Sequence, residues 1–152
     1  MLFRSAGFGK GDVAAVLAET RPETVYTDLA ILGAGGASMA LHPEEEADSV
    51  ARRLHAAGAS CIFVEGEEQL DKVLTIRTEC PALSRIVIFD MKGLRDFKDP
   101  QCESLEAFIA NGARGNDWDS AVAKVAADDA AVLLFPPGMN SGVGQAFSHA
   151  EV

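Results

Sequence analysis

The sequence predicts a three-layer α/β fold, in which helices cover both faces of a mostly parallel sheet of about five strands. The sequence contains several short runs in which every residue is apolar. Such runs are typical of strands that are buried on both faces of a sheet. Segments with apolar residues at helical spacing separate these runs. Glycine and proline mark many of the junctions. An alternation of strands and helices favours a sheet with helices packed on both sides.

Five apolar runs are expected to form the strands, because each is short and rich in strand-forming residues. They are residues 13–17, 37–41, 61–64, 85–89 and 131–135. The stretch around Phe147 reads as the start of another strand. In contrast, the segment from Met91 to Glu103 is polar and contains Pro100, so we expect an excursion there rather than a regular element.

Proline and glycine mark the ends of the first two predicted helices. Pro22 stands where proline is tolerated, in the first turn of a helix that ends at the glycine-rich residues 33–36. Because residues 33–36 follow a helix and precede a strand, we interpret them as a helix stop with close packing, not as a dinucleotide-binding motif. Pro43 is expected to open the second helix, and Gly58 to end it.

Three further helices complete the predicted pattern. Residues 70–76 have apolar side chains at helical spacing and precede the helix breaker Pro81. Two shorter helices are expected at 105–110 and 118–125. Since neither a linker nor a repeat interrupts the alternation, we expect residues 1–152 to form a single α/β domain.

Composition limits the classes of partner. The chain has 23 acidic and 13 basic residues and a net charge of -10, which argues against binding to nucleic acid. No run approaches the roughly 20 apolar residues of a membrane span. Cys61, Cys80 and Cys102 are widely spaced and lack a C-x-x-C pair, so reduced thiols are favoured over a disulfide or zinc site. We expect a cytoplasmic protein.

The acidic and histidine residues do not form an evident metal or catalytic motif. The acidic run 44–48 is read as a solvated first helical turn that complements the helix dipole, with a cation site as the alternative. His42, His55 and His149 lie far apart in the sequence and are interpreted as surface or boundary residues.

The strongest candidate site follows the last predicted strand. Ligands of α/β sheets bind outside the carboxyl ends of the strands, and a glycine-rich loop follows Phe135. Backbone N–H groups near Gly138 and Gly142, with the side chains of Asn140 and Ser141, offer donors to a phosphate. The spacing differs from G-x-x-x-x-G-K-[ST] and no lysine follows, so a plain Pro-Pro-Gly turn is the alternative.

Five segments resemble, in order, the AMP-forming acyl-CoA synthetases of the adenylate-forming superfamily. Residues 9–23 resemble G-x-x-x-G-D-x-V-A-I-L-x-x-N-x-P-E, residues 29–43 resemble A-I-L-x-A-G-A-V-x-V-P-L-x-P, and residues 57–64 resemble S-G-A-x-x-L-F-V. Residues 69–74 and 81–90 look most like the long-chain fatty-acid–CoA ligase branch. The ordered succession makes the resemblance more specific than any single segment.

The resemblance also assigns the glycine-rich segment to the family's phosphate loop, [YF]-T-S-G-T-T-G-x-P-K-G, which precedes a strand like V-M-L-[ST]-H. Gly138, Asn140, Ser141 and Gly142 would be its phosphate-binding equivalents here. Prolines replace Thr-Ser at 136–137, and Gly144 or Gln145 falls where the lysine belongs. The loop is therefore expected to be degenerate, because the missing lysine removes a charge-assisted hydrogen bond to phosphate.

The resemblance implies a ligase-like function in fatty acid metabolism. Family members activate a carboxylate with ATP and magnesium and then transfer the acyl group to coenzyme A. The family's adenine, ribose and magnesium contacts and its carboxyl-terminal lid lie beyond the matched region. We therefore expect a fragment or degenerate synthetase that is inactive alone, with no catalytic or metal residue and no securely bound cofactor. Its partner would be the remainder of a larger synthetase or a second copy. The alternative is a non-enzymatic protein-interaction module.

Overall fold

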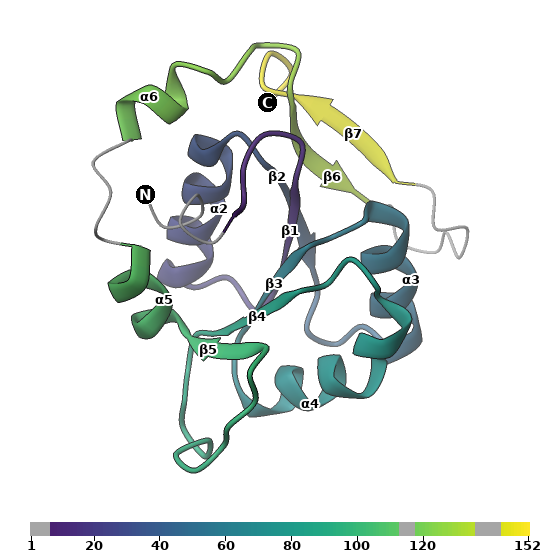
Figure 1. Cartoon of the computed structure of the whole chain (residues 1–152). Coiled ribbons are helices and arrows are strands. Elements are labelled where there is room, and N and C mark those ends of the chain that lie inside the picture. Colours follow the sequence, from purple (N-terminus) through teal and green to yellow (C-terminus); the bar gives the residue numbers. More distant parts are fainter. Residues whose placement is uncertain (1–6, 113–117, 136–143) are drawn as a thin grey trace.

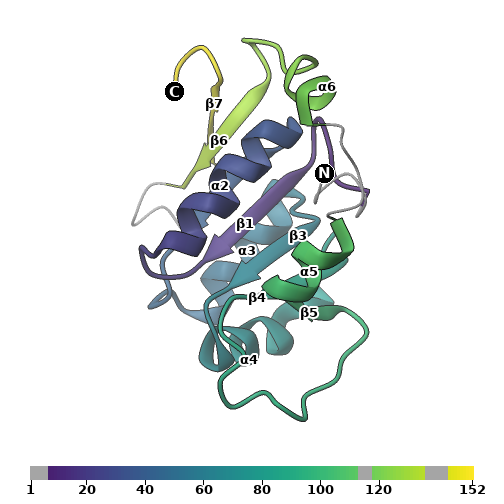
Figure 2. The same cartoon turned by 90° about the vertical axis from the view of Figure 1, so that its left-hand side faces the viewer.

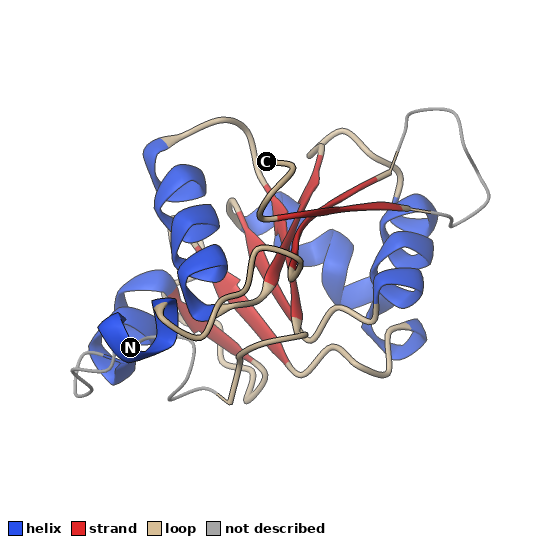
Figure 3. Ribbon diagram, turned by 90° about the horizontal axis from the view of Figure 1, so that it is seen from above, coloured by secondary structure: helices blue, strands red, loops and turns tan. Residues whose placement is uncertain are grey.

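The computed structural model describes residues 7–112, 118–135 and 144–152, and these form a sheet covered by helices on both faces (Figures 1 and 3). The predicted α/β fold is confirmed. The sheet has seven strands in the order β5-β4-β3-β1-β2-β6-β7, rather than about five. All neighbouring strands run parallel except β6 and β7, which are antiparallel.

The described strands are β1 (Val13–Leu17), β2 (Ala37–Leu41), β3 (Cys61–Val64), β4 (Arg85–Ile88), β5 (Cys102–Ser104), β6 (Ala130–Leu134) and β7 (Gln145–Ser148). The described helices are α2 (Pro22–Ala34), α3 (Ala47–Ala57), α4 (Glu67–Ile76), the 3₁₀ turn η1 (Arg77–Glu79), α5 (Leu105–Gly112) and α6 (Trp118–Val122).

The interpretation of residues 91–103 as an excursion without an element was wrong at its end. Cys102–Ser104 forms β5, which pairs in parallel with β4, Ile86 opposite Cys102 and Ile88 opposite Ser104. A short edge strand is stabilised by its backbone ladder and needs no apolar run, so the polar composition concealed it.

The second predicted helix begins later than expected. It starts at Ala47 and not at Pro43, because residues 42–45 form a turn in which Glu45 N donates to His42 O at 3.0 Å. The carboxylate of Glu45 closes the same turn by accepting from His42 N, also at 3.0 Å. Residues 44–46 of the acidic run therefore belong to a loop before the helix, whereas Asp48 lies in the first turn as expected.

Alternate residues of the central strands supply two separate apolar layers. On one face Leu17, Met39 and Ile62 pack with residues of α3 and α4 such as Leu54 and Val73. The opposite-facing layer joins α2 and α5 to the sheet, and its members include Val16, Phe63, Ile31 and Phe108. Because each central strand is buried on both faces, the sheet requires helices on both sides.

Two glycines explain how α2 ends against the sheet. Gly35 has φ 84°, a left-handed conformation, and its N–H closes the helix on Leu32 O at 2.9 Å. At Gly36 a Cβ would collide with the ring of Phe8 and lie 3.0 Å from Asp12 O. The predicted helix stop with close packing is therefore confirmed.

The three thiols are unpaired, with Cys61 and Cys80 buried and Cys102 half-buried. Burial raises the pKa of Cys61 to about 12. In the described part of the chain, no helix has the length and apolar character needed to cross a bilayer. The cytoplasmic location stays a prediction.

We expect Gly36→Ala to lower the free energy of unfolding by about 1–3 kcal/mol, because the added methyl group overpacks the Phe8 ring. Urea unfolding followed by circular dichroism measures the change. Gly9→Ala is the matched control, since its Cβ meets nothing within 4 Å, and should stay within about 0.5 kcal/mol of the parent. Equal losses in the two variants would contradict the packing argument.

Candidate functional site

A cleft with a volume of about 940 Å³ opens at the carboxyl ends of β1, β2 and β6. Its walls come from residues 18–20 after β1, residues 42–46 after β2, the first turns of α3, and Phe135 after β6. From β1 the chain turns to α2 on one face of the sheet, and from β2 it turns to α3 on the other (Figure 3). Such a divergence between neighbouring parallel strands is where α/β proteins bind ligands.

The loop after β1 is held in place by Glu65, the residue that follows β3. Glu65 Oε2 accepts from Glu19 N at 2.8 Å, and Glu65 Oε1 lies 3.5 Å from Arg21 NH1. Arg21 also pairs with Glu23 at 2.8 Å, and this hydrogen bond raises the pKa of Arg21 and lowers that of Glu23. Its guanidinium lies 5.9 Å from the centre of the Phe89 ring. The loop after β1 is thus tied to Glu65, which follows β3, and to Phe89, which follows β4.

The loop after β2 is organised by Glu45. In addition to the His42 backbone, the Glu45 carboxylate accepts from Arg53 NH1 at 2.9 Å and from Ser49 Oγ at 3.3 Å. Lys72 of α4 donates to the carbonyl oxygens of Pro43 and Glu45, the latter at 2.8 Å. These bonds pre-organise one wall of the cleft without any ligand.

Phe135 contributes the third wall of the cleft and immediately precedes the predicted phosphate loop. Its ring centre lies 5.7 Å from the Arg53 guanidinium carbon. A Cβ at Gly144, the first described residue after the loop, would lie 2.8 Å from Phe135 Cζ. Phe135 therefore lies beside Arg53 of α3 and close to Gly144, so the two described residues that flank segment 136–143 are near each other.

The predicted site residues Gly138, Asn140, Ser141 and Gly142 lie outside the described residues. The sequence reasoning missed Glu45, Arg53 and Lys72. Nothing in their local pattern marks them, because their contacts join loop 42–46 to α3 and α4. Phe135 had a signal, since it ends an apolar strand before a glycine-rich stretch.

The three histidines do not converge. His42 is exposed beside the cleft, and His55 is exposed near the end of α3, with its Nδ1 3.1 Å from Glu79 O. His149 follows β7 at the opposite edge of the sheet, where its N–H donates to Asp129 O at 3.0 Å. Its Nε2 is buried and has no hydrogen-bond partner in the described part of the chain.

The charges of the cleft are mainly acidic. Glu19 and residues 44–46 contribute four carboxylates, against the guanidinium groups of Arg52 and Arg53. Arg53 is already paired with Glu45. Within residues 7–112, 118–135 and 144–152, no three Asp, Glu, His or Cys side chains group so as to hold a metal ion. The described walls therefore do not fit a magnesium–triphosphate by themselves.

The structure is an α/β fold with a cleft at the carboxyl ends of its strands, the position at which proteins of this class bind ligands. Residues 1–138 match the family described as AMP-binding enzyme, so the chain belongs to this family. The adenylate-forming relationship predicted from the sequence is confirmed at this level.

Solved structures of adenylate-forming enzymes share the fold. Coronafacic acid ligase from Pectobacterium brasiliense superposes with a TM-score of 0.77 at 17% identity, covering 97% of this chain and 27% of that one. The anthranilate CoA ligase AuaEII, in complex with anthranoyl-AMP, gives a TM-score of 0.72 at 18% identity and covers 97% and 26%. The chain thus spans about a quarter of these structures.

A curated relative extends the comparison to a larger assembly. Bacitracin synthase 1 from Bacillus licheniformis is 33% identical over 66 residues, which is 43% of this chain and 1% of that protein. The A domain of carboxylic acid reductase from Segniliparus rugosus, in complex with AMP and a co-purified carboxylic acid, matches 93% of this chain and 25% of its own length, at 17% identity and a TM-score of 0.72.

We expect Lys72→Met to loosen the wall formed by residues 43–46, because it removes two charge-assisted hydrogen bonds to carbonyl groups. The loss of unfolding free energy should be about 1–3 kcal/mol, measured by urea denaturation, with amide shift changes concentrated at residues 43–46. Lys92→Met, at an exposed lysine without a side-chain partner among the described residues, is the control. If both variants lose the same stability, the bridging role is wrong.

Proposed function

We propose that this chain forms the amino-terminal α/β domain of a carboxylate-activating, AMP-forming ligase. The observation that carries this proposal is the cleft at the carboxyl ends of β1, β2 and β6, whose lining includes Phe135, the residue before the segment assigned to the phosphate loop. Membership of the AMP-binding enzyme family supports it. The proposal treats residues 1–152 as one domain, because both apolar layers pack on the same sheet.

We propose a long-chain fatty acid as the acid that the complete enzyme activates. Support comes from residues 69–74 and 81–90, which resemble the long-chain branch. These residues lie mainly in α4 and β4 and do not line the cleft. They therefore support a common origin with the long-chain branch, and not a direct contact with the acid. The solved relatives are named for other acids, anthranilate and coronafacic acid.

The segment 136–143 is proposed to be a weakened phosphate loop. Gln145, which aligns near the family's lysine, is exposed at the start of β7 and carries no charge. Two prolines at 136–137 also remove backbone donors. When bound, ATP and magnesium supply the leaving pyrophosphate and neutralise its charge, and the described residues offer no carboxylate cluster for that metal. Nucleotide affinity is therefore expected to depend on groups contributed by the rest of the enzyme.

By itself the chain is proposed to be inactive. Adenylation requires the acid, the nucleotide and the metal to be oriented around one transition state. This chain spans only 26% of the anthranilate CoA ligase and 27% of coronafacic acid ligase. The chain's own residues would position one wall of the cleft and the ends of the loop, while the reacting groups come from elsewhere.

We expect no pyrophosphate release above a no-protein blank when the chain is incubated with ATP, magnesium and palmitate. A coupled pyrophosphate assay and mass spectrometry for palmitoyl-adenylate measure the outcome. An intact long-chain acyl-CoA synthetase run in parallel shows that the assay works. Detection of the adenylate with this chain alone would overturn the proposed inactivity.

A second candidate function is a stand-alone protein-interaction module, and the exposed surface of one helical layer bears on the choice between this module and a ligase domain. Among the described residues, every large apolar side chain that is exposed on a helix belongs to α2, α5 or α6. These helices lie on the same face (Figure 2). Val25, Tyr26 and Leu29 of α2 are 50%, 68% and 58% exposed, and the opposite side of that helix buries Ile31. A helix that is apolar on both sides is typical of a helix covered by further protein.

We propose that the rest of the ligase covers this face. About three quarters of each relative's chain lies outside the part matched here, and this remaining chain is the proposed cover for an exposed apolar surface. On the isolated chain the same surface is left open and should pair with a second copy. A monomer that is indifferent to ATP would favour the stand-alone module instead.

We expect the chain to self-associate in a concentration-dependent way, and the double variant Tyr26→Ser/Leu29→Gln to shift it toward the monomer. Both side chains are exposed, so the fold should persist, as circular dichroism would verify. Size-exclusion chromatography with light scattering measures the mass. The control is Glu68→Gln/Asp71→Asn on α4, at exposed positions of the opposite face.

A parent chain that is monomeric at every concentration would contradict the open-face argument, as would an equal effect of both double variants. Thermal denaturation with and without ATP is the companion measurement, because a ligand that binds only the folded state raises the melting temperature. An oligomer stabilised by ATP supports the ligase domain.

A further inference from the structure

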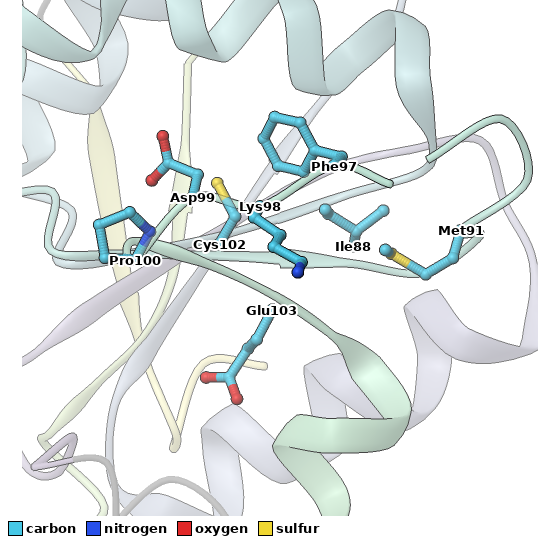
Figure 4. Close-up of a pocket in the computed structure, with 8 residues that line it drawn as sticks. All are labelled: Ile88, Met91, Phe97, Lys98, Asp99, Pro100, Cys102 and Glu103. Atoms are coloured by element: carbon cyan, nitrogen blue, oxygen red, sulfur yellow. The ribbon is translucent and has the colours of Figure 1, made fainter. Parts of the chain in front are cut away.

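A second hollow, of about 390 Å³, lies beside β4, β5 and the segment that joins them. Figure 4 shows its lining side chains. Ile88, the last residue of β4, is buried, and Met91 and Phe97 are half-buried against the main apolar layer. The hollow shares no lining residue with the cleft described above.

The joining segment is held in a defined shape, so the hollow exists before any ligand binds. Leu94 is buried, and its N–H donates to Met91 O at 3.0 Å. Phe97 N donates to Leu94 O at 3.1 Å, and Gln101 Nε2 donates to Leu83 O at 2.7 Å. Pre-formed concave surfaces of this kind are typical of small-molecule sites.

Both carboxylates of the hollow are already neutralised by arginines. Asp99 Oδ2 accepts from Arg77 NH1 at 2.7 Å, and Glu103 Oε1 accepts from Arg85 NH1 at 2.6 Å. Lys98 has no ion pair or side-chain hydrogen bond among the described residues, and in Figure 4 the Glu103 carboxylate points away from its ammonium group. One positive charge is therefore left without a partner beside an apolar surface.

The thiol of Cys102 contributes to the apolar wall of the hollow and carries no charge. Burial raises the pKa of Cys102 to about 11, so the thiol is protonated at neutral pH. Together with Ile88, Met91 and Phe97 it forms a surface suited to hydrocarbon.

We propose that this hollow binds a small monocarboxylate with an apolar body, whose carboxylate pairs with Lys98 and whose hydrocarbon packs on Met91 and Phe97. A neutral ligand would leave the ammonium unpaired. A phosphate ester carries a second negative charge, for which the single ammonium of Lys98 offers no partner. The volume lies near the lower end of the range for small-molecule sites, which suits an acid of about eight carbons. This site is independent of the proposed ligase function.

The test is a titration of the ¹⁵N-labelled chain with octanoate at pH 7, with octanamide as the uncharged isostere. We expect saturable amide shifts within residues 91–103 and tighter binding of octanoate than of octanamide. Lys98→Gln should weaken octanoate binding roughly two- to fivefold, as for an ion pair at an exposed lysine, and leave octanamide unchanged.

Lys92→Gln is the matched control, because Lys92 is exposed in the same segment but does not line the hollow. It should bind both ligands as the parent does. The proposal fails if octanoate and octanamide bind equally to the parent, if Lys98→Gln and Lys92→Gln behave alike, or if the shifts lie at the cleft or on α2. It also fails if no saturable shift is seen.

Discussion

Burial of the central strands on both faces is the constraint on which the rest of this structure depends. Ala14 and Ala15 in β1, like Ile62 and Phe63 in β3, are neighbours in sequence that point to opposite faces, and all are fully buried. Such strands are stable only when helices cover both sides of the sheet. The helices that follow β1 and β2 lie on opposite faces of the sheet, and the cleft opens where these two connections diverge.

The same constraint explains the different character of the two helical layers. On the α3 and α4 side the outer surface is polar, and Lys72 and Arg53 use it to hold the loop beside the cleft. The α2 side presents apolar residues outward as well as inward. The layer of α3 and α4 thus presents a polar surface to water, whereas the α2 side leaves apolar surface available for a further contact.

Regular features were predictable from the sequence because they depend on local periodicity. The runs at 13–17, 37–41 and 61–64 coincide with β1, β2 and β3, and the glycines at 35–36 end α2 as expected. The edge strand β5 was not predictable, since Cys102–Ser104 contains no apolar run and gains its structure from pairing with β4. The late start of α3 follows from Glu45 binding its own loop, a contact that helix propensity does not encode. Of the candidate site, the sequence located the end of β6 at Phe135 but not the walls around it.

The sequence by itself determined the α/β class, the ordered resemblance to adenylate-forming enzymes and the absence of a lysine after the glycine-rich stretch, since these reside in residue order and type. Only the tertiary structure decided that Glu45, Arg53, Lys72 and Phe135 meet at one edge of the sheet, and that Lys98 lies beside an apolar hollow with no ion pair in the described part of the chain. The physical reason is that such contacts join segments far apart in the chain, and their geometry is fixed by how the helices pack on the buried strands.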